Sequence, residues 1–184
     1  TAIRSRVQVR KFQTTGCPAN PFNPTEAAAQ LLGFFFNTNA TVPGNATSDV
    51  IAGVGLRRHS DSTDSPDVLE VFYFVGLCSD PDCANNQPIG SGVLGTATTG
   101  QWVRLLVQWD KDQHRFIFQR GTQPPVFVTY DGFSDTAAPG FQLKSLDAIQ
   151  FVANCAGDPH LSTRPVGMVD ALFDNVFVNE STIP

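Results

Sequence analysis

Three arginines alternate along the first predicted strand, which runs from Ile3 to Phe12. Arg4, Arg6 and Arg10 fall on one side of this strand, because successive side chains of an extended chain point to opposite faces. A row of guanidinium groups can donate hydrogen bonds to an acidic or hydroxyl-rich ligand. The alternative is a solvated face near a sheet edge, where charge discourages aggregation.

A second group of polar and aromatic side chains lies on the hairpin that we predict over residues 102–120. Trp102, Arg104 and Gln108 share one face of its first strand. The opposite face is apolar and consists of Val103, Leu105, Val107 and Trp109. This period of two predicts a strand with a buried side and a wetter side. We expect the apolar face, Trp109 included, to lie in the core.

Four cysteines allow three disulfide connectivities. Cys78 and Cys83 bracket the turn-forming sequence SDPD, so a bridge across a tight loop is expected there. Cys17 follows the first strand and Cys155 closes a late one, which favours them as the second pair. A zinc site is the alternative, but the chain has no CxxC pair and its histidines are scattered. Disulfides indicate an oxidising compartment and therefore a secreted, periplasmic or cell-surface protein.

Short strands joined by turns account for the rest of the chain. Further strands are expected over residues 27–37, 49–57, 68–77, 126–130, 146–154 and 168–179. Residues 78–99 are expected to form a decorated hairpin loop that leads into a strand over 92–96. No stretch is a convincing amphipathic helix. About ten to twelve strands with turn signals between them predict an all-β fold of two packed antiparallel sheets, in one domain over residues 1–184.

Composition excludes several classes of protein. The net charge of −5 and the pI near 5.0 argue against a nucleic-acid partner, which would favour a basic surface. No apolar run approaches the roughly 20 residues that a membrane-spanning helix needs. The chain starts at Thr1 with no signal-peptide pattern, so we expect any signal peptide to have been removed or to lie outside this sequence.

Two segments resemble a known group of folds. The hairpin WVRLLVQWDKDQHRFIFQRG resembles the step in laminin-G and concanavalin A-like jelly rolls where a W-x-x-hydrophobic-x-hydrophobic-x-W/Y strand precedes a charged turn and an aromatic strand. The closing strand ALFDNVFVN resembles the ending shared by those domains and many carbohydrate-binding modules. The resemblance implies a two-sheet jelly-roll sandwich. This superfold carries many functions, so it implies less about activity.

In jelly rolls of that group, the exposed face of the concave sheet often holds the ligand. Sugars stack on aromatic rings while their hydroxyls bind planar polar groups. The resemblance therefore implies a non-catalytic, lectin-like module that binds glycan on its concave sheet. The expected contact residues are Trp102, Arg104, Gln108, Tyr73, Arg4 and Arg6.

A glycan-cleaving enzyme of the same fold is the first alternative. The related laminarinase-type hydrolases carry two glutamates and an aspartate at alternate positions of one strand. This chain has only Glu26, Glu70 and Glu180, and the same-face neighbours of Glu70, Val68 and Phe72, are apolar. That family's catalytic residues therefore cannot be carried over.

A polysaccharide lyase would need a histidine, a tyrosine and a cationic side chain gathered in a cleft. His114, Tyr73, Tyr130 and Arg104 are of these types, but their spacing predicts no such group. A structural or adhesive domain of a larger surface protein, with loops that contact a protein partner, is a third alternative.

One cofactor follows from the resemblance. In several sugar-binding jelly rolls the aspartate of the last-strand motif helps to hold a structural calcium ion, and Asp174 stands at the matching position. Asp170 lies on the same predicted strand face and could join it. The alternative is an aspartate that pins a loop by hydrogen bonds.

Overall fold

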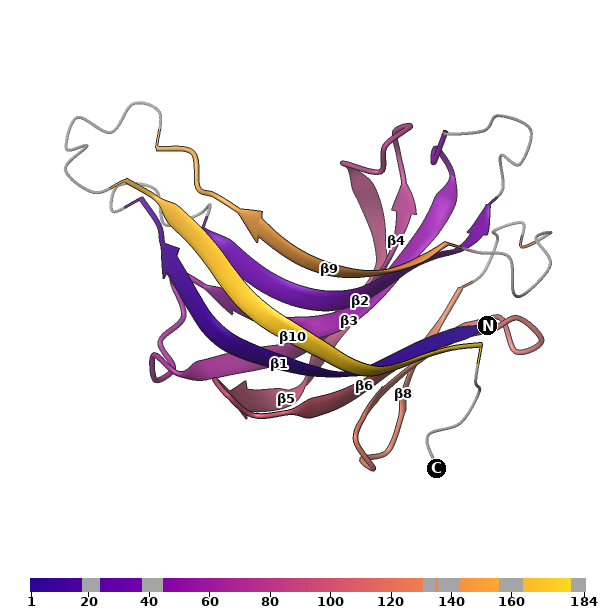
Figure 1. Cartoon of the computed structure of the whole chain (residues 1–184). Coiled ribbons are helices and arrows are strands. Elements are labelled where there is room, and N and C mark those ends of the chain that lie inside the picture. The colour runs from indigo at the N-terminus through magenta and orange to yellow at the C-terminus, as the bar shows by residue number, and fades with distance from the viewer. Residues whose placement is uncertain (18–23, 38–44, 131–134, 136–142, 156–163, 180–184) are drawn as a thin grey trace.

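A computed structural model of the chain describes residues 1–17, 24–37, 45–130, 135, 143–155 and 164–179, with the backbone alone for 34–37. Ten strands in these residues form two five-stranded antiparallel sheets that stack on each other (Figure 1). The all-β sandwich predicted from the sequence is confirmed, and it is compatible with a jelly roll. The described part of the chain contains no helix, hence none long and apolar enough to cross a membrane.

Sheet A has the strand order β10-β1-β6-β7-β8 and contains both the first and the last strand. Its strands are β1 (Ala2–Thr15), β6 (Val103–Asp110), β7 (Arg115–Arg120), β8 (Val126–Thr129) and β10 (Val166–Val178). Sheet B has the order β5-β4-β3-β2-β9. Its strands are β2 (Glu26–Asn37), β3 (Asp49–His59), β4 (Val68–Cys78), β5 (Asn86–Thr98) and β9 (Lys144–Phe151).

The core lies between the two sheets and follows the predicted alternation. Its largest fully buried side chains are Trp109, Phe116 and Phe118, all from the β6–β7 hairpin. The predicted apolar face of this hairpin is buried throughout, comprising Val103, Leu105, Val107 and Trp109. Sheet B contributes branched residues such as Leu31, Val54, Leu56 and Val71. Because every second side chain of both sheets enters this layer, the intervening residues face outward.

Strand β5 is longer than the sequence predicted. It pairs with β4 from Thr98 back to Asn86, whereas only residues 92–96 were expected to be extended. Glycine and proline have low strand propensity, so local sequence indicated a loop. Pairing along the edge of sheet B overrides that preference. Gly92 also leaves room for a neighbour, because a Cβ there would stand 2.6 Å from the Tyr73 hydroxyl oxygen.

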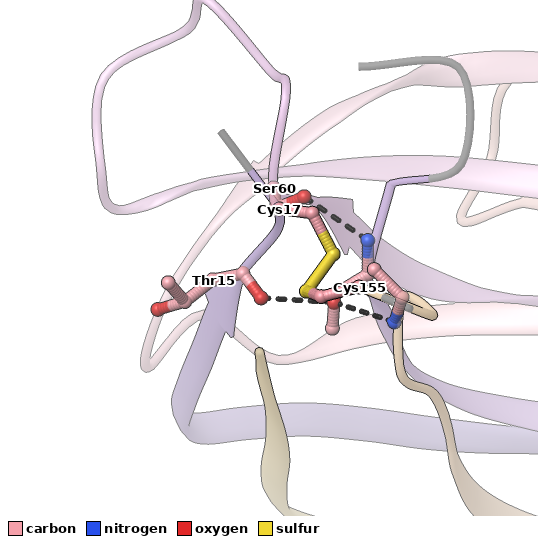
Figure 2. Close-up of a disulfide and its surroundings, with 6 residues drawn as sticks. Thr15, Cys17, Ser60 and Cys155 are labelled. Carbon is pink, nitrogen blue, oxygen red and sulfur yellow. Dashed lines mark hydrogen bonds between the residues drawn. A yellow bond between two sulfur atoms is a disulfide. The ribbon is translucent and has the colours of Figure 1, made fainter. Parts of the chain in front are cut away.

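Two disulfides join Cys17 to Cys155 and Cys78 to Cys83, the connectivity that we preferred from the sequence. The first connects the end of β1, in sheet A, to the segment that follows β9, in sheet B (Figure 2). The second closes a tight loop between β4 and β5. The long-range bridge therefore ties the two layers together at one end of the sandwich.

Thr25 lies beside the long-range disulfide and is fully buried. Its hydroxyl donates to the carbonyl oxygen of Thr15 over 2.9 Å and accepts from the amide of Ala153 over 3.0 Å. Its backbone amide donates to the Ser60 hydroxyl, and its carbonyl accepts from the Ser60 amide. Figure 2 shows these contacts around the bridge. One threonine thus connects three segments that are distant in sequence.

Both sheets curve in the same direction. Strands β2 and β9 of sheet B lie inside the curve of β1 and β10 of sheet A (Figure 1). The outer surface of sheet A is therefore on the convex side of the molecule, and that of sheet B is on the concave side.

Candidate ligand-binding surface

The antiparallel register of sheet A brings three arginines together on its outer surface. Arg6 stands opposite Arg104, where β1 pairs with β6, and Arg4 is two residues earlier on the same face of β1. On the other side of β1, strand β10 places Phe177 opposite Arg4 and Asp174 opposite Arg6. Residues far apart in sequence therefore meet on one outward face.

An irregularity in β10 opens a hollow at this point. The pairing advances by two residues on β1 but by three on β10 between Phe177 and Asp174, which is the signature of a β-bulge. Asn175 within the bulge has a left-handed backbone, with φ of 53°. The resulting hollow has a volume of about 290 Å³, and we call it the arginine hollow. It is lined by Arg4, Ser5, Arg6, Arg104, Asn175 and Phe177.

Two of the arginines lie over aromatic rings. The guanidinium carbon of Arg4 is 4.3 Å from the centroid of the Phe177 ring, and that of Arg6 is 4.9 Å from the Trp102 ring. Arg6 also forms a 3.6 Å ion pair with Asp174. Stacking on a ring fixes the plane of a guanidinium. The Arg6 side chain is partly exposed, whereas Arg4 is buried.

A second hollow adjoins the first. It has a volume of about 210 Å³, and we call it the tryptophan hollow. It is lined by Gln101, Trp102, Val103, Arg104, Arg120, Gly121, Thr122 and Gln123. Arg104 borders both hollows, is exposed, and has no ion-pair partner among the described residues. The two hollows therefore form one surface with this guanidinium at its centre.

Charge is segregated within the molecule. The strands of sheet A carry seven of the twelve Lys and Arg side chains but only three of the seventeen Asp and Glu side chains. The cations are Arg4, Arg6, Arg10, Lys11, Arg104, Arg115 and Arg120, and the acids are Asp110, Asp170 and Asp174. Sheet A is thus locally basic in a chain whose net charge is −5. An anion would be attracted to this sheet although the whole chain is acidic.

The structure places the six residues of the sequence interpretation in three locations. Arg4, Arg6 and Arg104 converge, and Trp102 lies beside them in the second hollow. Gln108 also lies on β6, opposite Ala2, but it lines neither hollow. The surface that they form belongs to the convex side, whereas the resemblance had implied the concave sheet (Figure 1).

Tyr73 is separate from this surface. It lies on β4 of sheet B, and its ring packs inward at 4.8 Å from the ring of Phe118. The sequence interpretation had grouped Tyr73 with Trp102 as a ligand contact. The structure corrects this, because Tyr73 shares a strand face with the buried residues Val71 and Val75. The same alternation was visible in the sequence and could have assigned Tyr73 to the core.

The two aspartates that the resemblance linked with calcium both face arginines. Asp170 accepts from Arg10 over 2.7 Å, and Asp174 pairs with Arg6 over 3.6 Å. A guanidinium beside each carboxylate repels a metal cation. Among the described residues, no group of three or more His, Cys, Asp or Glu side chains is placed to hold a metal ion. These positions suit ion pairs better than calcium.

The concave side carries two of the three glutamates. Arg57 of β3 lies between them, 3.7 Å from Glu26 and 3.0 Å from Glu70. His59 is 3.0 Å from the same Glu26 carboxylate. A hydrolase needs both carboxylates directed at the sugar. Here both are engaged by one guanidinium, so they form an ion-pair network and not a catalytic pair.

A network at the far end of sheet A was not predicted from the sequence. Trp109 donates from its indole nitrogen to the Tyr130 hydroxyl over 2.9 Å, and that hydroxyl donates to Asp135 over 2.5 Å. His114 Nδ1 lies 3.2 Å from the same carboxylate oxygen. Burial, followed by the Asp135 carboxylate, raises the pKa of Tyr130. The hydroxyl is therefore held protonated, as the donor to Asp135.

A comparison with models of known protein families finds no match, and a comparison with curated protein sequences finds none either. The function of the chain is therefore argued from its own residues. The surface on sheet A carries planar donors, two aromatic rings and an excess of positive charge.

Proposed function

We propose that this protein is a secreted, periplasmic or cell-surface module of the concanavalin A-like jelly-roll type that binds glycan without cleaving it. The ligand lies on the outer surface of sheet A. The observation that carries the proposal is the convergence of Arg4, Arg6 and Arg104 with the rings of Phe177 and Trp102 around two adjoining hollows. Aromatic faces and planar donors are the groups that sugars use.

The size of the hollows favours a chain of sugars over an enclosed small molecule. At about 290 and 210 Å³, each is smaller than most pockets that enclose a drug-sized ligand. Because Arg104 borders both, one oligosaccharide can occupy them in succession. Ligand units in neighbouring hollows gain affinity together, since the second contact is intramolecular.

The disulfides support the proposed location. Bridges such as Cys17–Cys155 persist in oxidising compartments and are rare in the cytosol. The proposed site uses strands of one sheet and needs no second domain. An adhesive domain that binds protein through its loops would leave the arginine and tryptophan hollows without a role, so we place it second.

The test is a glycan array probed with the wild-type chain and two variants. Trp102→Ala removes the ring of the tryptophan hollow, and we expect it to weaken binding by about tenfold, as for a stacking aromatic side chain. Phe127→Ala is the matched control, because Phe127 is also an exposed aromatic residue on the outer side of sheet A but lines neither hollow. Binding that Trp102→Ala leaves intact, or a wild-type chain that binds no glycan, would refute the proposal.

A parallel assay separates binding from cleavage. Each polysaccharide that binds is incubated with the protein, and the release of reducing ends is measured. We expect no release above the rate with buffer alone. Turnover that is lost on Glu70→Gln or His114→Ala would instead identify an enzyme.

A further inference from the structure

We infer that the ligand is a polyanionic glycan, with carboxylate or sulfate groups, and that Asp174 is an internal competitor which such a group displaces from Arg6. This inference rests on the proposed function and deepens it. It is carried by the geometry of Arg6 and Arg104, which line the arginine hollow, and of Asp174, which pairs with Arg6.

A neutral sugar does not require an excess of cations. Amides also bind hydroxyls, and Asn or Gln in place of these arginines would avoid repulsion between like charges. Here Arg104 is exposed between the hollows with no ion-pair partner among the described residues, and Arg6 lies beside it. At physiological ionic strength, salt screens the interaction between exposed charges beyond about 8 Å. A bound anion therefore interacts mainly with the nearby arginines, although the chain as a whole is acidic.

Arg6 is oriented for anions. Trp102 covers one face of its guanidinium, and the side chain is partly exposed. The planar edge of a stacked guanidinium can then donate two parallel hydrogen bonds. Carboxylate and sulfate oxygens accept such a pair with matching geometry, which a single hydroxyl does not.

Asp174 is held in a way that allows exchange. Its distance to Arg6 is 3.6 Å and both side chains are partly exposed, at 50% and 38%. The neighbouring pair is tighter, because Arg10 contacts Asp170 at 2.7 Å and 3.1 Å through two nitrogens. Asp174 also accepts from the amide of Asn175 over 2.8 Å. When a ligand anion takes Arg6, this second contact remains available to the aspartate.

The experiment uses pairs of polysaccharides that differ only in charge. Binding of the full chain is measured by calorimetry with polygalacturonate and its methyl ester, and with dextran sulfate and unmodified dextran. We expect each charged member to bind at least about tenfold more tightly than its neutral partner, since charge-assisted hydrogen bonds are the stronger ones. Affinity for the charged member should also fall as salt is added.

Variants test the role of Asp174. Asp174→Asn should tighten binding of the charged polymer by about two- to fivefold, the range of an exposed ion pair, and leave binding of the neutral partner unchanged. Asp170→Asn is the matched control, because it releases Arg10 outside the hollow. Arg104→Gln should weaken the charged ligand by about tenfold.

The outcomes separate the inference from the proposed function. If neutral and charged partners bind equally, the inference fails and glycan binding stands. If Asp174→Asn weakens the charged polymer as Arg104→Gln does, Asp174 contacts the ligand and is no competitor. If no polysaccharide binds but single-stranded DNA does, both the inference and the proposed function are overturned.

Discussion

Trp109 and Tyr130 are joined by a hydrogen bond, in which the indole Nε1 donates to the phenol oxygen over 2.9 Å. Both side chains are buried, at 1% and 3% exposure. The bond connects the end of β6 to the residue that follows β8, two strands away in sheet A. It satisfies the only donor of a large indole in the core, and it directs the Tyr130 hydroxyl proton toward Asp135.

Removing that hydroxyl should destabilise the fold. Tyr130→Phe deprives Trp109 of its acceptor and Asp135 of its donor, and a buried group left without a partner costs about 1–3 kcal/mol. The loss is measured from urea unfolding. Tyr73→Phe is the control, because the Tyr73 hydroxyl has no hydrogen-bond partner among the described residues. Equal losses for the two variants would show that the network contributes nothing.

The same network predicts a dependence on pH. Burial opposes ionisation of Asp135, but hydrogen bonds from Tyr130 and His114 outweigh it and lower the pKa of the carboxyl. A lowered pKa in the folded state stabilises the fold above the unfolded value of about 4, and this contribution is lost as pH falls through the folded pKa.

Asp135→Asn isolates this contribution. The difference in urea midpoint between wild type and variant should be largest near about pH 7 and shrink toward about pH 3. A difference that is constant over this range would contradict a role for the ionised carboxylate. Asp112→Asn, at an exposed position of the β6–β7 turn, controls for the loss of one negative charge.

The two disulfides should contribute unequally to stability. In the chain-entropy model, the Cys17–Cys155 bridge, with a separation of 138 residues, contributes about 5 kcal/mol. The Cys78–Cys83 bridge spans five residues and contributes about 2 kcal/mol. We expect replacement of both cysteines of the long-range bridge by serine to lower the unfolding midpoint further than the same change in the short one. The reverse order would exclude loop entropy as the main cause.

Thr25 should be sensitive to the loss of its hydroxyl. Thr25→Val keeps the shape of the side chain but leaves the Ala153 amide without its acceptor and Thr15 without one donor. Because Thr25 is fully buried, the expected loss is about 2–3 kcal/mol in urea unfolding. Thr25→Ser retains the hydroxyl and should lose less. A serine variant as unstable as the valine variant would assign the effect to packing.

Alternation in the 102–120 hairpin was sufficient to predict a buried and an outward face, since side chains on one strand face share an environment. Alternation in the first strand likewise placed Arg4 and Arg6 on one face, and alternation in the hairpin placed Arg104 on its outward face. Which strands become neighbours is decided by long-range pairing, and no local pattern encodes that Arg6 stands opposite Arg104. The side of the curvature on which these arginines lie was likewise not encoded in any local pattern.

Two other features depended on tertiary context. The bulge at Asn175 is a shift in the pairing of β1 with β10. The sequence of one strand does not indicate which strand it pairs with, so the bulge could not be predicted. The contact between His114 and Asp135 needs the β6–β7 turn and the chain after β8 to meet. In contrast, the inward direction of Tyr73 is predictable from the sequence, because Tyr73 alternates in step with the apolar residues Val71 and Val75.

The bulge in β10 has a further consequence for solubility. β10 is the edge strand of sheet A, it is long, and it exposes apolar side chains that include Leu172, Val176 and Val178. A straight edge of this kind is a template on which foreign strands assemble into fibrils. One inserted residue breaks the spacing of its free amides and carbonyls, so the irregularity beside the arginine hollow also hinders other copies of this chain from pairing with this edge.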